Sequence, residues 1–171
     1  MLRIKTTWGE ITVGAASGRI TSCTLPFVAR RPSTPFKTTG SKIEADNASD
    51  RAALAQADRF VRGLFDGAPV RLPNVAVPEA APFMARAWKA MMAIPAGRAI
   101  TYGELAKKSG SPRAVRAAGQ ACAKNQIPLF IPCHRILGAG GKLGGFSCGL
   151  PWKELLLERE GSIVSAKSAS V

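Results

Sequence analysis

Residues 102–121 read YGELAKKSGSPRAVRAAGQA, and this stretch decides how the second half of the chain folds. Its first seven residues predict a short helix, and the serine-glycine pair that follows predicts a turn. Ser111 is a favourable N-cap, and Pro112 suits the first turn of a second helix. Two helices joined by a turn of three or four residues form a helix-turn-helix, which often binds nucleic acid.

The predicted second helix is rich in small side chains, which would let its backbone lie close to a partner. They are Ala114, Ala117, Ala118, Gly119 and Ala121. Arg113 and Arg116 add positive charge to the same segment. Since alanine favours helices in any protein, the composition fits both a nucleic-acid-binding helix and an ordinary one.

Downstream, residues 131–135 read IPCHR, and His134 is the only histidine of the chain. The thiolate is the nucleophilic form of cysteine, and a neighbouring base or positive charge raises its fraction. Apolar residues 127–131 predict a strand before Cys133, and a glycine-rich loop over residues 138–149 follows it. Such an arrangement would place a reactive thiol between a rigid element and a pocket wall. The alternative is a buried, inert cysteine beside a surface histidine.

The charge of the chain favours a polyanionic partner. The 171 residues carry a net charge of +13, and the 46% that are hydrophobic suffice for a real core. Between Gly97 and Leu150 stand eight Lys or Arg residues and a single acid, Glu104, so this segment alone has a net charge of +7. A polyanion would therefore be attracted to the half that carries Cys133. A membrane surface would attract it too, but the segment shows no basic amphipathic helix with large apolar residues.

The sequence indicates neither a metal site nor a membrane span. The four cysteines form no CxxC pair, and with one histidine a zinc site would need an unusual ligand set. We expect no metal and no cofactor. The N-terminus lacks the apolar core of a signal peptide, and no apolar run approaches the ~20 residues of a membrane span. We therefore expect a cytoplasmic protein, nuclear in a eukaryote, with reduced thiols.

The first half of the chain predicts a small α/β domain. Three short strands, expected to form an antiparallel sheet, cover residues 2–7, 11–16 and 20–25. Residues 30–42 are basic and rich in Pro, Ser and Thr, which predicts a mobile loop. A helix capped by Ser49 or Asp50 then runs to Asp66, where Gly67 ends it.

Residues 68–78 contain three prolines and predict a linker between two domains. We expect an N-terminal scaffold domain over residues 1–78, a C-terminal domain over 79–161 and a disordered tail over 162–171. Further helices are predicted from Phe83 to Ile94 and from Trp152 to Glu160.

From about Pro82 to Gly161 the chain resembles the O6-alkylguanine-DNA alkyltransferases, also called methylated-DNA–protein-cysteine methyltransferases. The resemblance rests on ordered blocks rather than on one motif. They are Phe83…Arg86-Ala87-Trp88, Ile94-Pro95-Ala96-Gly97, Thr101 to Ala106, Ala114 to Gly119, Asn125, Ile131 to Arg135 and Lys153-Glu154…Glu160-Gly161. The sequence departs from the family's common residues at four positions, Ala96, Gln126, Phe146 and Cys148.

The resemblance implies an α/β N-terminal domain with a small antiparallel sheet and a mostly helical C-terminal domain containing a helix-turn-helix. It implies DNA repair by stoichiometric transfer of the alkyl group from O6-alkylguanine in duplex DNA to Cys133. His134 would act through a water as the base, and Glu160 would orient it. Asn125 would shape the turn that supports the site, and Tyr102 would donate a hydrogen bond to the departing guanine.

The resemblance also implies a monomer that binds the minor groove and extrudes the damaged nucleotide, with Arg116 filling the gap. The remaining DNA-binding positions would be Tyr102, Ser111, Arg113, Ala114, Ala117, Ala118, Gly119 and Arg135. The substrate pocket would be formed by Gly145, Phe146, Ser147 and Cys148. We expect the Cys148 side chain to narrow this pocket, because glycine is common at its position.

Three other classes of protein fit part of the pattern. A helix-turn-helix transcription factor would need no Cys-His pair. A cysteine hydrolase would use Cys133 and His134 but leaves the helix of Arg116 unexplained. An alkyltransferase-like protein, which binds damaged DNA without transfer, lacks the reactive cysteine that is present here.

Overall fold

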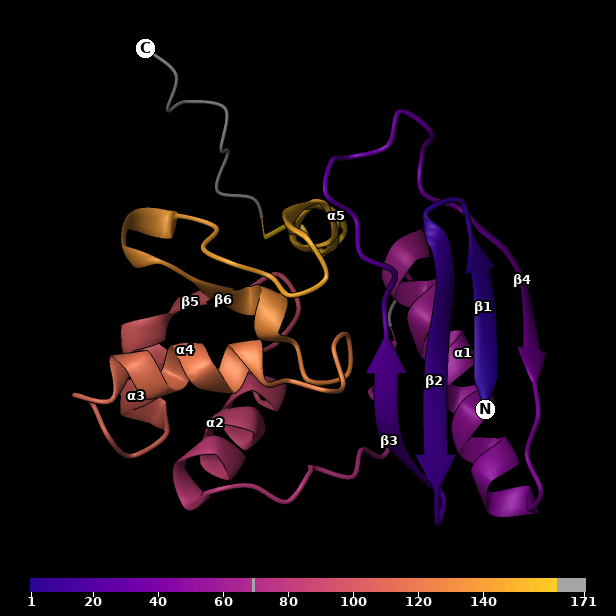
Figure 1. Cartoon of the computed structure of the whole chain (residues 1–171), viewed down its shortest axis with the longest axis horizontal. Helices are drawn as coiled ribbons and strands as arrows, with labels where there is room; N and C mark the ends of the chain where they lie inside the picture. The colour runs from indigo at the N-terminus through magenta and orange to yellow at the C-terminus, as the bar shows by residue number, and fades with distance from the viewer. Residues whose placement is uncertain (69, 163–171) are drawn as a thin grey trace.

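The computed structural model describes residues 1–68 and 70–162, which form a sheet-and-helix part and a helical part (Figure 1). The first part contains β1 (Leu2–Thr6), β2 (Gly9–Ala16), β3 (Arg19–Thr24), β4 (Thr38–Ile43) and α1 (Ala48–Asp66). The second contains α2 (Pro82–Met92), β5 (Ile100–Thr101), α3 (Tyr102–Lys108), α4 (Val115–Ala123), the 3₁₀ turn η1 (Cys133–Arg135), β6 (Ile136–Leu137), η2 (Ala139–Gly141) and α5 (Leu150–Arg159). The predicted fold class is confirmed.

The antiparallel sheet has the strand order β3-β2-β1-β4 and packs one face on α1. Alternation along β1 buries Leu2 and Ile4, which pair with Val13 and Ile11 of β2. The helix α1 is capped by Asn47, whose side-chain oxygen accepts from the backbone N–H of Asp50, rather than by Ser49 or Asp50 as predicted. Its end at Gly67, in the left-handed region, agrees with the prediction.

The prediction of a mobile loop over residues 30–42 is wrong for its second half. Residues 38–43 form β4, which pairs antiparallel with β1 and makes a fourth strand at the edge of the sheet. Its residues are exposed or half-buried, so no apolar alternation marks the strand in the sequence. Backbone pairing with β1 holds it, and the buried ring of Phe36 anchors the segment that leads into it.

The connection between α1 and α2 runs along the outer edge of β3. Ile20 donates to the carbonyl of Asn74 and accepts from the N–H of Ala76, which makes a parallel bridge with Val75. The domain boundary at residue 78 remains our proposal. Residues 163–171, where we predicted most of the disordered tail, lie outside the described residues. Within the described ranges, no helix is long and apolar enough to cross a membrane.

The helix-turn-helix is present, but its second helix begins later than predicted. The first helix, α3, has the predicted bounds because Thr101 and Glu104 form a capping box at its start. Ser111 is not the N-cap of α4. It accepts from the N–H of Ala114 in a turn, and α4 begins at Val115.

The predicted strand over residues 127–131 is also wrong. These residues are fully buried but form successive turns, with Leu129 at a φ of +73°. The buried Asn125 explains the difference. Its Oδ1 accepts from the N–H of Ile127 at 3.0 Å, and its Nδ2 donates to the carbonyl of Ile131 at 2.8 Å. Because the Asn125 side chain occupies these two backbone groups, they cannot pair with a neighbouring strand.

The helix α5 lies between the two parts of the molecule (Figure 1). Its Trp152 is fully buried, with its ring centroid 5.1 Å from that of Trp8, 5.5 Å from Phe36 and 6.0 Å from Phe65. The indole N–H donates to the carbonyl of Pro26 at 2.8 Å. The first part therefore holds α5 through an aromatic cluster, which we define as Trp8, Phe36, Phe65 and Trp152.

The loop before α5 is also fixed by the first part. Gly149 has a φ of +99°, and a Cβ there would lie 1.9 Å from the carbonyl oxygen of Val28. Val28 in turn donates its N–H to the carbonyl of Cys148 at 3.0 Å. This close backbone approach requires glycine at position 149.

Replacing Trp152 with Ala should destabilise the protein by about 3–5 kcal/mol, because it empties the aromatic cluster and breaks the bond to Pro26. Chemical denaturation of both proteins measures the difference. Phe27→Ala is the control, since this ring is 72% exposed and its loss should cost at most about 0.5 kcal/mol. A loss below about 1 kcal/mol for Trp152→Ala would contradict the role given to the cluster.

Candidate active site and nucleic-acid interface

Cys133 opens the short turn η1, and its side chain is 5% exposed at the bottom of a cavity of about 320 Å³. The cavity is lined by residues from α3, α4, η1 and the glycine-rich loop. They are Tyr102, Gly119, Cys122, Ala123, Cys133, Gly145, Phe146 and Ser147. The structure thus brings together the predicted nucleophile, the predicted hydrogen-bond donor and three of the four predicted pocket residues.

Asn125 connects the fold of the supporting loop to the thiol. Besides its two bonds to the loop backbone, its Nδ2 lies 3.1 Å from the Sγ of Cys133 and donates to it. A donor at this distance stabilises the thiolate over the thiol. The amide therefore both shapes the turn, as expected, and contacts the reacting atom.

His134, Arg135 and Glu160 form a buried network beside Cys133. The Nε2 of His134 lies 3.0 Å from Oε1 of Glu160, whose side chain is 1% exposed. Arg135 donates from Nη2 to the same oxygen at 2.7 Å and from Nε to Oε2 at 2.9 Å. Its Nη1 also donates to the carbonyl of Ile94. The last turn of α5 is thereby tied to the turn that carries the thiol.

Glu160 is ionised at neutral pH. Burial acts to raise its pKa, but hydrogen bonds from His134 and Arg135 outweigh burial and lower the pKa to about 2. An ionised carboxylate can only accept, so Nε2 of His134 carries the hydrogen and Nδ1 is the free acceptor. The depressed carboxyl pKa stabilises the fold above the ordinary value of 4.5, and this contribution is lost as the pH falls toward 2.

The Nδ1 atom of His134 is a buried nitrogen with no hydrogen-bond partner among the described residues. Burial lowers the pKa of His134, although its hydrogen bond to Glu160 opposes the effect. The ring is therefore neutral at rest and holds an unused basic nitrogen. A buried polar atom of this kind is the usual position for a bridging water.

The resting form of Cys133 is the thiol rather than the thiolate. Burial raises its pKa to about 11, and the bond from Asn125 and the positive charge of Lys153 offset only part of that rise. A base is therefore needed to make the nucleophile at neutral pH. The neutral, oriented His134 can supply that base.

Lys153 is a candidate site residue to which the sequence analysis assigned no role, although it belongs to the last block of the resemblance. Its side chain is fully buried on α5, and its Nζ donates to the carbonyl of Ile136 at 2.6 Å, to that of Leu143 and to that of Gly145 at 3.5 Å. The ammonium thus joins the strand after the thiol to the pocket wall. No carboxylate of the described ranges lies within ion-pair distance of it, which is costly for a buried charge.

Burial lowers the pKa of Lys153, while the negative charges that Cys133 and Cys122 would carry as thiolates act to raise it. The thiolate of Cys133 is therefore the anion that this cation stabilises. The sequence gives little indication that Lys153 is buried beside the thiol, because lysine is normally solvent-exposed.

Three residues predicted at the site face elsewhere. Arg135 was expected to bind DNA, but its side chain is 11% exposed and paired with Glu160. Ala118 was also expected there, yet it is fully buried in the contact of α4 with its neighbours. Cys148 does not line the cavity. Its carbonyl accepts from Val28, and its thiol lies 3.8 Å from the hydroxyl of Ser147.

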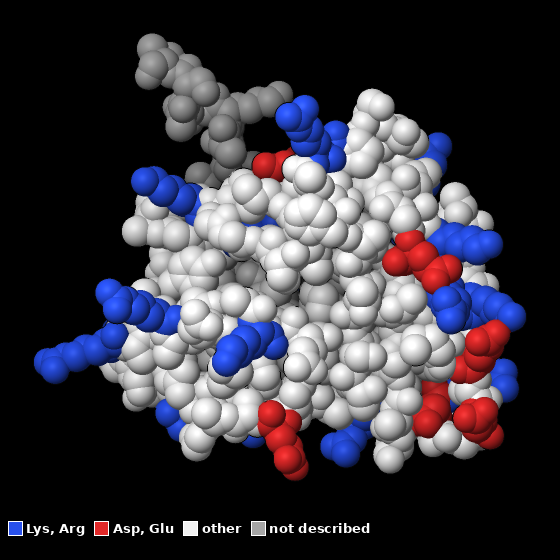
Figure 2. Space-filling view, in the orientation of Figure 1, with Lys and Arg blue, Asp and Glu red and all other residues white. Residues whose placement is uncertain are grey.

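The predicted DNA-binding residues that remain lie on the accessible side of α4 and the turn before it. Ser111, Arg113 and Ala114, with Pro112, line a shallow hollow, and Arg116 is exposed. Arg116 and Gly119 are one helical turn apart on α4, and Gly119 lines the cavity of Cys133. Figure 2 shows Lys and Arg side chains over the side of α3 and α4, while Asp and Glu gather toward α1 and β4. This face suits a polyanion.

The sequence analysis also missed Cys122 and Ala123 as parts of the cavity wall. Their spacing from Gly119, three and four residues, is the signal that could have shown them to share its face of the helix. Cys122 is half-buried, and burial raises its pKa to about 12.

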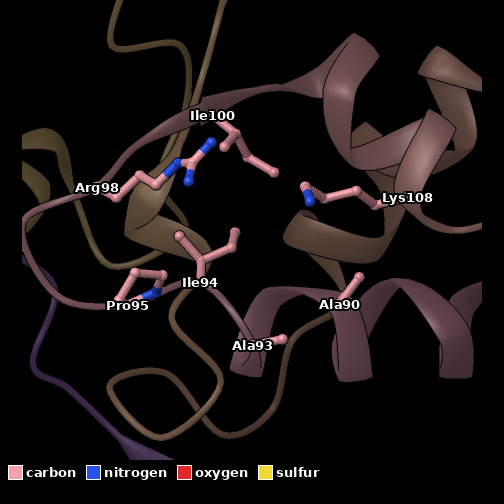
Figure 3. A pocket seen from close by; sticks show the side chains of 7 residues that line it. All are labelled: Ala90, Ala93, Ile94, Pro95, Arg98, Ile100 and Lys108. Atoms are coloured by element: carbon pink, nitrogen blue, oxygen red, sulfur yellow. The ribbon is translucent and has the colours of Figure 1, made fainter.

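A second hollow, of about 280 Å³, lies behind the catalytic network rather than at the thiol. Figure 3 shows Arg98 and Lys108 pointing toward one another across its apolar floor, which includes Ile94 and Ile100. The carbonyl of Ile94 receives Arg135, so this hollow backs onto the network but holds none of its groups.

Residues 82–162 match a family model described as the DNA-binding domain of 6-O-methylguanine DNA methyltransferase. A methylated-DNA–protein-cysteine methyltransferase of Methanosarcina acetivorans is 43% identical over 112 residues, which are 66% of this chain and 69% of that protein. One of Mycobacterium tuberculosis H37Rv is 48% identical over 80 residues, 47% of this chain and 48% of the other.

Solved structures are similar over nearly the whole chain. The crystal structure of Mycobacterium tuberculosis OGT in complex with DNA has a TM-score of 0.74 and 31% identity, and the match covers 94% of this chain and 91% of that one. The structure of an O6-methylguanine DNA methyltransferase from Methanococcus jannaschii has a TM-score of 0.59 and 26% identity, covering 95% of each chain. The similarity thus includes both the sheet and the helical part.

Replacing Lys153 with Met should raise the pKa of Cys133 above about 11, because it removes the positive charge that, among the described residues, lowers this pKa. The rate at which iodoacetamide labels Cys133, followed over pH, should shift to higher pH and be several-fold lower at neutral pH. Lys142→Met is the control, since that lysine is exposed in the loop whose carbonyls Lys153 binds. Equal profiles for the two variants would contradict the electrostatic role of Lys153.

Proposed function

This chain belongs to the methylated-DNA–protein-cysteine methyltransferase family, and we propose that Cys133 is the cysteine on which it takes up the alkyl group. The protein repairs DNA by moving that group from O6 of guanine to itself, once per molecule. The observation that supports Cys133 most strongly is its position: a buried thiol at the bottom of a cavity, next to an oriented base, in the cationic half of the chain. Cys133 is the only one of the four thiols in contact with Asn125.

The substrate must leave the helix stack to reach this thiol. An O6 atom inside duplex DNA cannot approach a sulfur that is 5% exposed, so the nucleotide has to rotate outward, at a cost of a few kcal/mol. We assign to α4 the contact with the minor groove, where its small residues Ala114, Ala117 and Gly119 allow a close approach. Arg116, one turn from the cavity, would occupy the space that the nucleotide leaves.

Phosphate contacts would supply most of the affinity. Arg113, Arg116 and Lys124 are exposed on or beside α4 and carry no ion pair among the described residues. Such contacts bind without regard to sequence and weaken as salt rises. That is appropriate for a protein that must find rare lesions in any sequence.

The chemical step would begin with removal of the thiol proton. We propose that a water between Cys133 and Nδ1 of His134 passes the proton to the ring, and that Glu160 stabilises the imidazolium that forms. The thiolate then attacks the alkyl carbon. The new C–S bond forms as the bond between that carbon and O6 breaks, and the electron pair leaves with the guanine.

Tyr102 is suited to assist the leaving guanine. It lines the cavity, and burial raises the pKa of its hydroxyl, so the group stays protonated and can donate a hydrogen bond. The product is an uncharged thioether on Cys133. Because no base can readily cleave a thioether, the reaction ends there and each protein acts once.

We further propose that the protein acts as a monomer in the compartment of its DNA, the cytoplasm of a prokaryote or the nucleus of a eukaryote. All four cysteines are free, and the mechanism requires Cys133 to stay reduced.

Replacing Cys133 with Ala should abolish methyl transfer but leave the affinity for DNA within about two-fold, because phosphate contacts rather than the thiol bind the duplex. Intact-mass measurement after incubation with duplex DNA containing O6-methylguanine gives the readout. The native protein should gain one methyl group on the peptide that holds Cys133. Cys148→Ala, which changes a thiol outside the cavity, should still gain it. A methyl group on Cys122, Cys148 or Cys23 in the Cys133→Ala protein would show that the wrong nucleophile has been chosen.

A further inference from the structure

We propose that Cys122 is a resolving cysteine for Cys133. When a peroxide oxidises Cys133, Cys122 closes a disulfide with it, and a thiol reductant then restores the alkyl acceptor. This inference rests on the proposed function, since it concerns the protection of the same thiol. It assigns a chemical role to a residue of the cavity wall that takes no part in the proposed transfer steps.

The two cysteines belong to one cavity. Cys122, at the end of α4, and Cys133, at the start of η1, both line the 320 Å³ space. Asn125 links them directly. Its backbone N–H donates to the carbonyl of Cys122 at 3.3 Å, and its side chain donates to the Sγ of Cys133 at 3.1 Å. A single residue therefore contacts both the backbone of Cys122 and the sulfur of Cys133.

The two thiols also interact electrostatically. A negative charge on Cys133 acts to raise the pKa of Cys122, which burial has already raised to about 12. Both thiols are thus protonated and uncharged at rest, so they do not repel each other within the cavity.

The other two cysteines are less suitable partners. Cys23 is buried in β3, with its thiol in the core of the sheet part. Cys148 lies outside the cavity lining, and its thiol is beside the hydroxyl of Ser147. Of the described thiols, only that of Cys122 shares a cavity with Cys133.

Charged and titratable groups of several elements surround Cys133. They are Lys153 of α5, Tyr102 of α3, Cys122 of α4, Cys148 of the loop, Cys23 of β3 and the network of His134, Arg135 and Glu160. Cys133 alone receives a hydrogen bond from Asn125 and lies beside the base. The same activation that serves alkyl transfer would therefore make it the first thiol to react with a peroxide.

The proposed steps balance with hydrogen peroxide as oxidant. The Cys133 thiolate attacks one peroxide oxygen, the O–O bond breaks, and the departing hydroxide takes up the thiol proton as water, leaving a sulfenic acid. The sulfur of Cys122 then attacks the sulfenic sulfur, the S–O bond breaks, and a second water leaves with the proton of Cys122. The protein has lost two hydrogen atoms, and two equivalents of a thiol reductant reverse the change.

A reversible disulfide would benefit this protein because each molecule can transfer only one alkyl group. A protein that can accept one alkyl group has no spare nucleophile, and oxidation of Cys133 to sulfinic or sulfonic acid would end its activity irreversibly. A disulfide with Cys122 stops the oxidation at a reversible stage. Peroxide would then delay repair rather than prevent it.

The test compares the native protein with Cys122→Ala and with Cys148→Ala as the matched control. Each is treated with hydrogen peroxide, divided, and half is returned to dithiothreitol. Intact mass, mapping of the Cys122 and Cys133 peptides, and methyl transfer from O6-methylguanine DNA are then measured. Each activity is expressed relative to the untreated sample of the same variant, so that a change in basal activity does not enter the comparison.

The native protein and Cys148→Ala should lose two hydrogen atoms, show a disulfide between the two mapped peptides, and regain most of their activity with reductant. Cys122→Ala should instead gain two or three oxygen atoms on Cys133 and regain at least about ten-fold less activity. A disulfide to Cys148, or equal recovery of all three proteins, would overturn the proposal.

Two further outcomes remain interpretable. If Cys122→Ala does not fold, the disulfide map of the oxidised native protein decides alone, because absence of the Cys122–Cys133 link overturns the inference. If the untreated native protein transfers no methyl group, the proposed function has failed, while the disulfide map still reports on the pair of thiols.

Discussion

The carboxylate of Glu160 is the group on which the rest of the site depends. Buried at the end of α5, it receives hydrogen bonds from both His134 and Arg135, and it fixes the tautomer of the histidine ring. The same bonds hold α5 against the turn of Cys133. Removing Arg135 would leave the buried charge of Glu160 without its counter-charge, so the network stabilises the fold as well as orienting the histidine ring.

The position of α5 explains why the sheet part of the chain is needed. The aromatic cluster fixes one end of this helix through Trp152, and Glu160 occupies the other end. Between them, Lys153 holds the pocket wall through three carbonyls. Backbone bonds from Val28 to Cys148 and from Cys23 to Gln126 connect the sheet part to both loops that flank the thiol. The first part therefore positions the site although it supplies none of the reacting groups.

Burial of Cys133 raises its pKa and so lowers its reactivity, and the surrounding groups offset part of this effect. Exclusion of water protects the thiol and defines the substrate cavity, but it raises the thiol pKa to about 11. Asn125 and Lys153 lower the pKa again in part, and in the mechanism that we propose the neutral His134 takes the proton. The arrangement keeps the nucleophile inactive until a substrate and a base act on it together.

The local elements of the fold could be predicted because their signals are local. The helix α3 has its capping box within four residues, and the end of α1 is set by Gly67. The motif around Cys133 and His134 likewise predicted a site that the structure builds around a cavity, and the comparisons confirm the family and the activity. The roles of individual residues in that site remain predictions.

The errors arose where distant contacts override local pattern. The strand β4 forms because its backbone pairs with the edge of β1. Residues 127–131 form turns because the Asn125 side chain binds their backbone. The family resemblance led us to assign Arg135 to DNA, whereas the tertiary fold pairs it with Glu160. Lys153 and Cys122 gave no sign of their positions for the same reason: a buried lysine and a cavity-lining thiol acquire their surroundings only when α5 and α4 have packed.

The most direct test of the account is the pH dependence of single-turnover methyl transfer in Glu160→Gln. This variant retains a hydrogen-bond acceptor for His134 but removes the negative charge that stabilises the imidazolium. The account predicts a rate at least about ten-fold lower than that of the native protein at neutral pH, with recovery as the pH approaches the thiol pKa of about 11, where the base is no longer needed. A native rate at neutral pH, or a defect of the same size at every pH, would contradict it.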